Sequence, residues 1–136
     1  MSANPTGSAP IAPSIAPWLS VGDANRALAF YGAAFGAVER YRLEDDAGNV
    51  MVARLSVGDA EFWIQDDVDV SAAAGERPIR LILTVDDPAA MLRQALAAGA
   101  TEVAPVADEH GWRSGRLADP FGHQWEVSKP LDEDLH

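Results

Sequence analysis

The first half of the chain begins with a short apolar run, which is followed by a helical pattern. Residues 15–21 form the apolar run. Asp23 can then cap a helix that ends at Gly36, because apolar and small residues recur between them at three- and four-residue spacing. These positions are Ala27, Leu28, Tyr31, Ala34 and Phe35. The pattern predicts a strand followed by an amphipathic helix.

Three strand-like runs follow this helix and complete a βαβββ unit. They cover residues 38–43, 50–57 and 61–65. Residues typical of turns separate the runs, at 45–49 and at Gly58-Asp59.

The same order of patterns then starts again. Residues 79–85 predict a strand, and Asp87 with Pro88 begins a second helix that stops at Gly99. The apolar stripe of this helix consists of Met91, Leu92, Ala95 and Leu96. Three more strands are expected at residues 101–106, 112–117 and 124–128.

An internal repeat supports this division into two units, because such a repeat constrains a fold more than any single element does. Val21-x-Asp23 recurs as Val85-x-Asp87 and Leu28 as Leu92, each 64 residues later. Arg54-Leu55 recurs as Arg116-Leu117 and Trp63 as Trp125, each 62 residues later. The change of spacing predicts one small insertion or deletion between the helix and the last hairpin.

The length of 136 residues suits one domain, which we expect at residues 15–130. Its modules would cover 15–66 and 79–129, joined by a linker at 67–78. Residues 1–14 are rich in Pro, Ala and Ser and predict a flexible extension, and 131–136 form an acidic tail. No run of 18 apolar residues exists and the first residues lack a signal-peptide pattern, so we expect a cytoplasmic protein.

Charge and cysteine content narrow the function classes. The net charge of −11 repels nucleic acid and anionic lipid, and favours cationic or neutral small molecules where it does not serve solubility alone. The chain has no Cys, which excludes disulfides, Cys-ligated metals and thiol nucleophiles.

The last strand region resembles the C-terminal signature of a known superfamily. The stretch Asp119-Pro120-Phe121-Gly122-His123-Gln124-Trp125-Glu126-Val127, preceded by Gly115-Arg116-Leu117, is similar to that of the vicinal oxygen chelate superfamily. This superfamily holds glyoxalases, bleomycin-resistance proteins and extradiol dioxygenases. The opening Pro17-Trp18-Leu19-x-Val21-x-Asp23 looks like the start of the same domain. The resemblance implies an α+β fold of two βαβββ modules, a half-open curled sheet with a ligand cavity, and frequently a homodimer.

In metal-dependent members, each half supplies two ligands from its strands. Carried over by position, these ligands fall at Ala16, Ile64, Ile82 and Glu126, and only Glu126 has a donor atom. A single carboxylate binds a divalent ion weakly. We therefore expect no intact metal site and no cofactor. Glu126 and His110 would be metal ligands only if a divalent metal binds in a rearranged site.

The three histidines and the acidic clusters offer little else. His136 is terminal, His110 lies in an expected loop, and for His123 we favour a structural hydrogen bond over catalysis. The clusters Asp45-Asp46 and Asp66-Asp67-x-Asp69 lack an EF-hand pattern and predict solvated turns. No catalytic residue is identified.

The remaining candidates are residues that could bind a ligand. Side chains alternate along a strand, so a cavity that includes Glu126 should also include Gln124, Phe62 and Ile64, while Trp63 and Trp125 pack outside against the helices. Further candidates are Trp18, Trp112, His110 and Arg116.

Three functions remain open. The first is a metal-independent protein that sequesters a drug or metabolite, which could be cationic or aromatic. The alternative is a divalent-metal-dependent enzyme of the glyoxalase or dioxygenase type with a rearranged site. The third is a small-molecule-responsive or stress protein that acts through its dimer surface.

Overall fold

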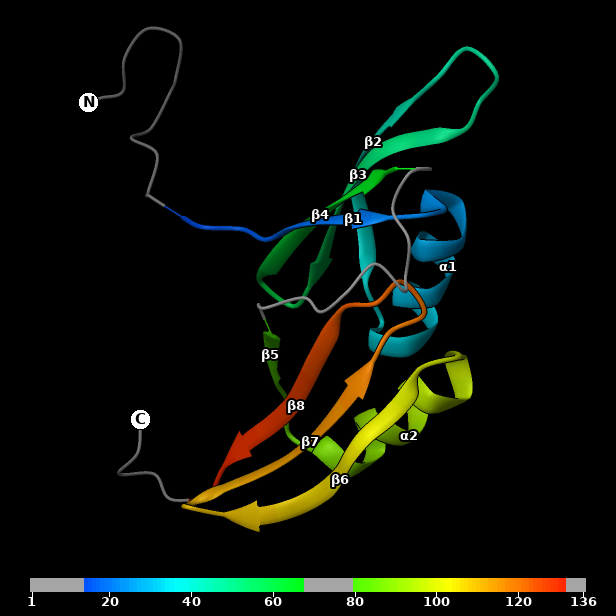
Figure 1. Cartoon of the computed structure of the whole chain (residues 1–136). Coiled ribbons are helices and arrows are strands. Elements are labelled where there is room, and N and C mark those ends of the chain that lie inside the picture. Colours follow the sequence, from blue (N-terminus) through cyan, green and yellow to red (C-terminus); the bar gives the residue numbers. More distant parts are fainter. Residues whose placement is uncertain (1–13, 68–79, 132–136) are drawn as a thin grey trace, which may run out of the picture.

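The computed structural model describes residues 14–67 and 80–131, and these form two βαβββ modules (Figure 1). The first module contains β1 (Trp18–Val21), α1 (Ala24–Phe35), β2 (Val38–Glu44), β3 (Val50–Val57) and β4 (Ala60–Asp66). The second contains β5 (Arg80–Thr84), α2 (Pro88–Ala98), β6 (Thr101–Glu109), β7 (Trp112–Ala118) and β8 (Gln124–Pro130). The α+β fold with two repeated modules is confirmed. Most of the expected terminal extension, most of the linker and most of the acidic tail lie outside the described residues.

Both helices begin and end where the sequence predicts. The Asp23 carboxylate accepts from the backbone N–H of Arg26, and the Asp87 carboxylate accepts from that of Ala90. Each is an N-cap that satisfies an otherwise unpaired donor of the first helical turn. Gly36 ends α1 in the left-handed conformation, at φ 70°. Neither helix is long and apolar enough to cross a membrane, and no other helix is found in the described residues.

Each module folds its strands into a separate four-stranded sheet. The strand orders are β1-β4-β3-β2 and β5-β8-β7-β6, and in each sheet the first pair is parallel and the other two are antiparallel. The two helices lie side by side and cover the same side of the two sheets (Figure 1). Each sheet therefore has a helix-covered face and an open face.

The core lies between the sheets and the helices, and aromatic rings from both modules fill its centre. Tyr31 of α1 contacts Phe62 of β4 at 5.1 Å between ring centroids and Trp125 of β8 at 5.7 Å. Helix α1 buries six side chains, including Phe30, Tyr31 and Phe35, whereas α2 buries only Pro88, Leu92 and Ala95. The first helix thus supplies most of the aromatic packing.

The structure corrects the repeat spacing of the last strand. Arg54 pairs with Trp63, and its repeat equivalent Arg116 pairs with Glu126. Trp63 is therefore equivalent to Glu126, and Trp125 to Phe62, at a spacing of 63 rather than 62. The reason is that five residues connect Ala118 to Gln124, one more than separate the paired residues Ser56 and Glu61.

Gly115 on β7 is held by close contact with the neighbouring strand. A Cβ at Gly115 would lie 2.8 Å from Val106 Cγ2 and 3.1 Å from the Val106 backbone nitrogen. We expect Gly115→Ala to lower the free energy of unfolding by about 1–3 kcal/mol, because β6 must move to admit the methyl group. Urea unfolding would measure the loss.

Gly32→Ala is the control, since the nearest atom there is at 3.7 Å and alanine favours a helix interior by about 0.5–1 kcal/mol. Equal stabilities for Gly115→Ala and the unsubstituted protein would contradict the prediction.

Candidate functional site

Three aromatic side chains gather on the open face of the first sheet, and we call this surface, made by Trp18, Tyr41 and Trp63, the aromatic face. The Trp18 and Trp63 rings stack, with centroids 5.9 Å apart and planes inclined by 24°. Tyr41 meets Trp63 edge-on, also at 5.9 Å. Trp18 is 53% exposed and Tyr41 46% exposed. The stack is fixed because Trp18 and Trp63 are direct partners in the parallel β1–β4 pair.

Polar groups border the aromatic face and hold its rings. The Trp18 Nε1–H donates to Gln65 Oε1 at 2.9 Å, and the Arg54 guanidinium lies 5.5 Å from the centroid of the Trp63 ring. Arg54 Nε is 3.9 Å from Glu61 Oε2, which is an ion pair but too long for a hydrogen bond. This surface can therefore accept a flat ring, and a cation can be attracted to it by the π faces and by Glu61.

The open face of the second sheet carries charges where the first carries rings. Arg80 Nε lies 3.3 Å from Glu126 Oε1, and Glu126 is the cross-strand neighbour of Arg116. Ile82, the β5 partner of Glu126, is 62% exposed. By strand alternation, Gln124 and Trp112 belong to this same face.

The expectation that Phe62, Ile64, Gln124 and Glu126 share one face is wrong. Phe62 and Ile64 are buried on the helix-covered face of the first sheet, while Gln124 and Glu126 lie on the open face of the second. Likewise Trp63 does not pack against the helices, although Trp125 does. The extra residue before β8 shifts the alternation by one position, so Phe62 and Ile64, which the spacing of 62 aligns with Gln124 and Glu126, lie on the opposite face.

His110 stands apart from the other predicted site residues. It occupies the turn between β6 and β7 with φ 53°, so it belongs to a hairpin tip. Whether any of the eight predicted residues binds a ligand stays a prediction. Sequence reasoning missed Tyr41 and placed Trp63 on the wrong face, because strand pairing rather than composition brings them beside Trp18.

The four paired inner-strand positions that face the open side carry one side chain able to bind a divalent metal. The paired inner strands present Trp18 opposite Trp63 and Ile82 opposite Glu126. Only Glu126 has oxygen donors, and its carboxylate already pairs with Arg80. Among residues 14–67 and 80–131, no three His, Asp or Glu side chains converge as metal ligands would.

A buried polar network joins the two modules behind this surface. Asp119 accepts from the Tyr31 hydroxyl at 2.6 Å and from Trp125 Nε1–H at 2.8 Å. Its second oxygen accepts from the backbone N–H groups of Phe121 and His123, both at 2.9 Å. Burial, with the Asp119 charge as the next cause, raises the pKa of Tyr31 well above its usual value. Tyr31 is therefore a protonated donor at neutral pH and a structural group.

His123 makes the structural hydrogen bond that the sequence predicts. Its Nε2 lies 2.9 Å from the backbone oxygen of Ser20 on β1, so it ties the second module to the inner edge of the first sheet. Its side chain is buried.

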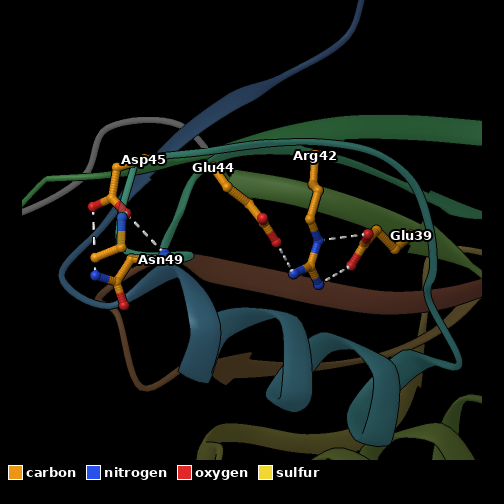
Figure 2. Close-up of polar contacts among 6 residues, drawn as sticks. Glu39, Arg42, Glu44, Asp45 and Asn49 are labelled. Carbon is orange, nitrogen blue, oxygen red and sulfur yellow. Dashed lines mark hydrogen bonds and ion pairs between the residues drawn. The ribbon is translucent and has the colours of Figure 1, made fainter.

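The acidic clusters belong to turns and caps within the described residues. The Asp45 carboxylate accepts from the backbone N–H groups of Ala47 and Asn49 at 2.9 Å, which closes the β2–β3 turn (Figure 2). These hydrogen bonds, that of Asn49 first, lower the pKa of Asp45. Asp66 instead accepts from the backbone N–H of Ala24 at the start of α1. The prediction of a solvated turn holds for Asp45, whereas Asp66 is the last residue of β4 and binds the start of α1, and Asp69 lies outside the described residues.

The outer strand β2 also carries a row of charged side chains. Arg42 lies between Glu39 and Glu44 and bonds both carboxylates, at 2.7 Å and 2.8 Å (Figure 2). The bond from Arg42 lowers the pKa of Glu39. All three side chains are exposed, so the row is a solvated surface that contributes little stability.

Comparison with known proteins agrees with this architecture. Residues 18–128 match the family model described as a glyoxalase-like domain. An uncharacterized protein from Mycobacterium bovis is 36% identical over 132 residues, which cover 90% of this chain and 87% of the relative.

Two solved structures are similar in fold and moderately similar in sequence. TioX from Micromonospora sp. ML1 is 26% identical with a TM-score of 0.68, covering 86% of this chain and 95% of its own. A glyoxalase-related enzyme from Fulvimarina pelagi is 25% identical with a TM-score of 0.67, covering 85% of this chain and 87% of its own.

Proposed function

Because this chain belongs to the glyoxalase-like domain family of the vicinal oxygen chelate superfamily, we propose that it binds and sequesters a small organic molecule on the aromatic face. The observation that carries the proposal is the half-exposed stack of Trp18 on Trp63. Large aromatic rings held rigidly at an open surface provide contact area at little entropic cost. Such a surface suits reversible binding.

The ligand is a planar ring system that is cationic or neutral. Flat rings stack on Trp18 and Trp63, and cations gain from the π faces of Trp and Tyr. The net charge of −11 attracts a cation to the protein at long range and repels an anion. Gln65 and Glu61, at the border of the rings, would orient polar substituents.

We further propose that binding proceeds without a resident metal ion and in a homodimer. The ion pair of Glu126 with Arg80 supports the absence of a metal, since a cation would have to displace the guanidinium. The superfamily resemblance supports the dimer. A metal-dependent enzyme with a rearranged site is the second candidate, supported by Glu126 and by the glyoxalase-related enzyme among the similar structures.

Proflavine, a planar aromatic cation, is a suitable probe for the aromatic face. We expect Trp63→Ala to weaken its affinity about tenfold or more, because the variant removes the stacking surface. Fluorescence titration measures the dissociation constant. Trp112→Ala is the matched control, since Trp112 is also an exposed tryptophan but lies on the second sheet. Equal losses in the two variants would contradict the proposal.

Elemental analysis of the purified protein separates the two candidate functions. About one bound divalent ion per chain, lost in Glu126→Gln, would favour the enzyme. Retention of proflavine binding after dialysis against a chelator would favour the metal-independent binding protein.

A further inference from the structure

A cavity of about 350 Å³ lies where the two modules meet, and Glu61 at the border of the aromatic face is one of its lining residues. Four parts of the chain line it: the segment before β1, the β3–β4 hairpin, the edge strand β5, and β8 through Trp125. Phe62 and Trp125, each 5% exposed, are its most buried lining residues, and their rings are 5.5 Å apart. We call it the seam cavity.

The lining of the seam cavity is apolar apart from one side that is acidic. The apolar lining side chains are Ile15, Ala16, Pro17, Val57, Ala60, Phe62, Leu81, Ile82, Leu83 and Trp125. The other three are Ser14, Asp59 and Glu61, so within the described part of the chain the charged lining residues are two carboxylates on the β3–β4 hairpin. Asp59 and Glu61 are both exposed, so the charges lie toward solvent and the apolar surface lies deeper.

The two carboxylates differ in how far they are already neutralised. Glu61 shares its charge with Arg54 at 3.9 Å, whereas Asp59 has no ion-pair or hydrogen-bond partner for its carboxylate among the residues described. A positive group placed beside Asp59 therefore meets an uncompensated negative charge. A negative group at the same place meets two like charges and is disfavoured.

We propose that the seam cavity is a second binding site, which takes an aliphatic cation: an apolar body with an ammonium-type head. The body fills the space against Phe62 and Trp125, and the head lies at Asp59 and Glu61. Its volume of about 350 Å³ is within the range of about 300–1,000 Å³ that small-molecule pockets have. The site shares Glu61 with the border of the aromatic face, but none of Trp18, Tyr41 and Trp63 lines it, and the proposal does not depend on the proposed function.

Octyltrimethylammonium, an eight-carbon chain with a cationic head, is the probe, and octanoate is its anionic counterpart. Calorimetric titration of the full chain should give saturable one-to-one binding of the cation, with octanoate at least about tenfold weaker because of the two carboxylates. Non-saturable uptake, or equal affinity for the two probes, would overturn the proposal.

Two pairs of variants locate the site. The double variant Asp59→Asn, Glu61→Gln should reduce the preference for the cation at least about fivefold, whereas Asp46→Asn, Glu102→Gln removes the same charge elsewhere and should leave it unchanged. Val57→Trp should fill the cavity and weaken the binding of both probes. Because Val57 is half-buried, Ile82→Trp provides a second obstruction at a residue that is 62% exposed and tolerant of bulk. Binding unaffected by both obstructions would refute the assignment.

Trp63→Ala distinguishes this site from the aromatic face. The variant should leave the affinity for octyltrimethylammonium unchanged, and it should weaken the binding of proflavine. If Trp63→Ala instead abolished octyltrimethylammonium binding, the cation would sit on the tryptophans and the seam site would be wrong, with the proposed function intact. If proflavine fails to bind while the seam variants behave as expected, the proposed function alone fails.

Discussion

Replacing Asp119 by alanine should lower the free energy of unfolding by about 3–5 kcal/mol. Asp119 is 5% exposed and accepts four hydrogen bonds, from the Tyr31 hydroxyl, the Trp125 indole and two backbone N–H groups. Alanine would leave these buried donors without an acceptor, and each unsatisfied group costs about 1–3 kcal/mol before the site relaxes. The Tyr31 bond also joins α1 to the second module, so the loss affects the contact between modules.

Urea unfolding followed by circular dichroism measures this effect. Asp119→Asn, which keeps acceptor oxygen but not the charge, should fall between the unsubstituted protein and the alanine variant. Asp46→Ala, in the exposed β2–β3 turn, serves as the control and should change stability by less than about 0.5 kcal/mol. A loss of less than about 1 kcal/mol in Asp119→Ala would show that the network is not essential to the fold.

Trp125→Ala should be comparably damaging, at about 3–5 kcal/mol. The Trp125 ring lies 4.7 Å from Phe35, 5.5 Å from Phe62 and 5.7 Å from Tyr31 between centroids, so its removal opens the centre of the core. The variant also removes the indole donor to Asp119.

The comparison with Trp112→Ala tests the physical reason for this loss. Trp112 is 37% exposed at the end of β7, and its truncation should cost less than about 1 kcal/mol. Trp125→Phe should be intermediate, because it keeps most of the packing but loses the hydrogen bond. Similar losses for Trp112→Ala and Trp125→Ala, in the same urea titration, would contradict the assignment of the core.

Local signals in the sequence were sufficient for the two modules. Asp23 and Asp87 cap the helices because a short carboxylate side chain can reach the free N–H groups, and Gly36 and Gly99 end them at positive φ. These effects act within a few residues, so the order of elements could be read along the chain.

The faces of the strands could not be read in the same way. The identity of Trp63 and Trp125 suggested equivalent positions, but one extra residue between β7 and β8 makes Phe62 the equivalent of Trp125. In a strand, a shift of one position exchanges the buried and open faces. The sequence therefore placed Phe62 and Ile64 in the candidate site although they are buried beneath the helices. Trp18, Gln124 and Glu126 were also predicted members, and these three do lie on open faces.

Long-range partners also escaped prediction. The hydrogen bond from the Phe121 N–H to Asp119 is a local turn that its sequence favours, but Tyr31 lies 88 residues away. The seam cavity combines four separate parts of the chain, and no local pattern marks it. Both features depend on how the modules meet.

The two helices should tolerate substitutions at different rates, although the two modules share one topology. Helix α1 buries six side chains with three large aromatic rings, whereas α2 buries three side chains, none of them aromatic. Random substitutions on the inner side of α1 will be eliminated by selection more frequently, because large cavities cost more stability. Sequence drift should accordingly be faster in α2. The buried positions of the first helix are thus expected to change more slowly than those of the second.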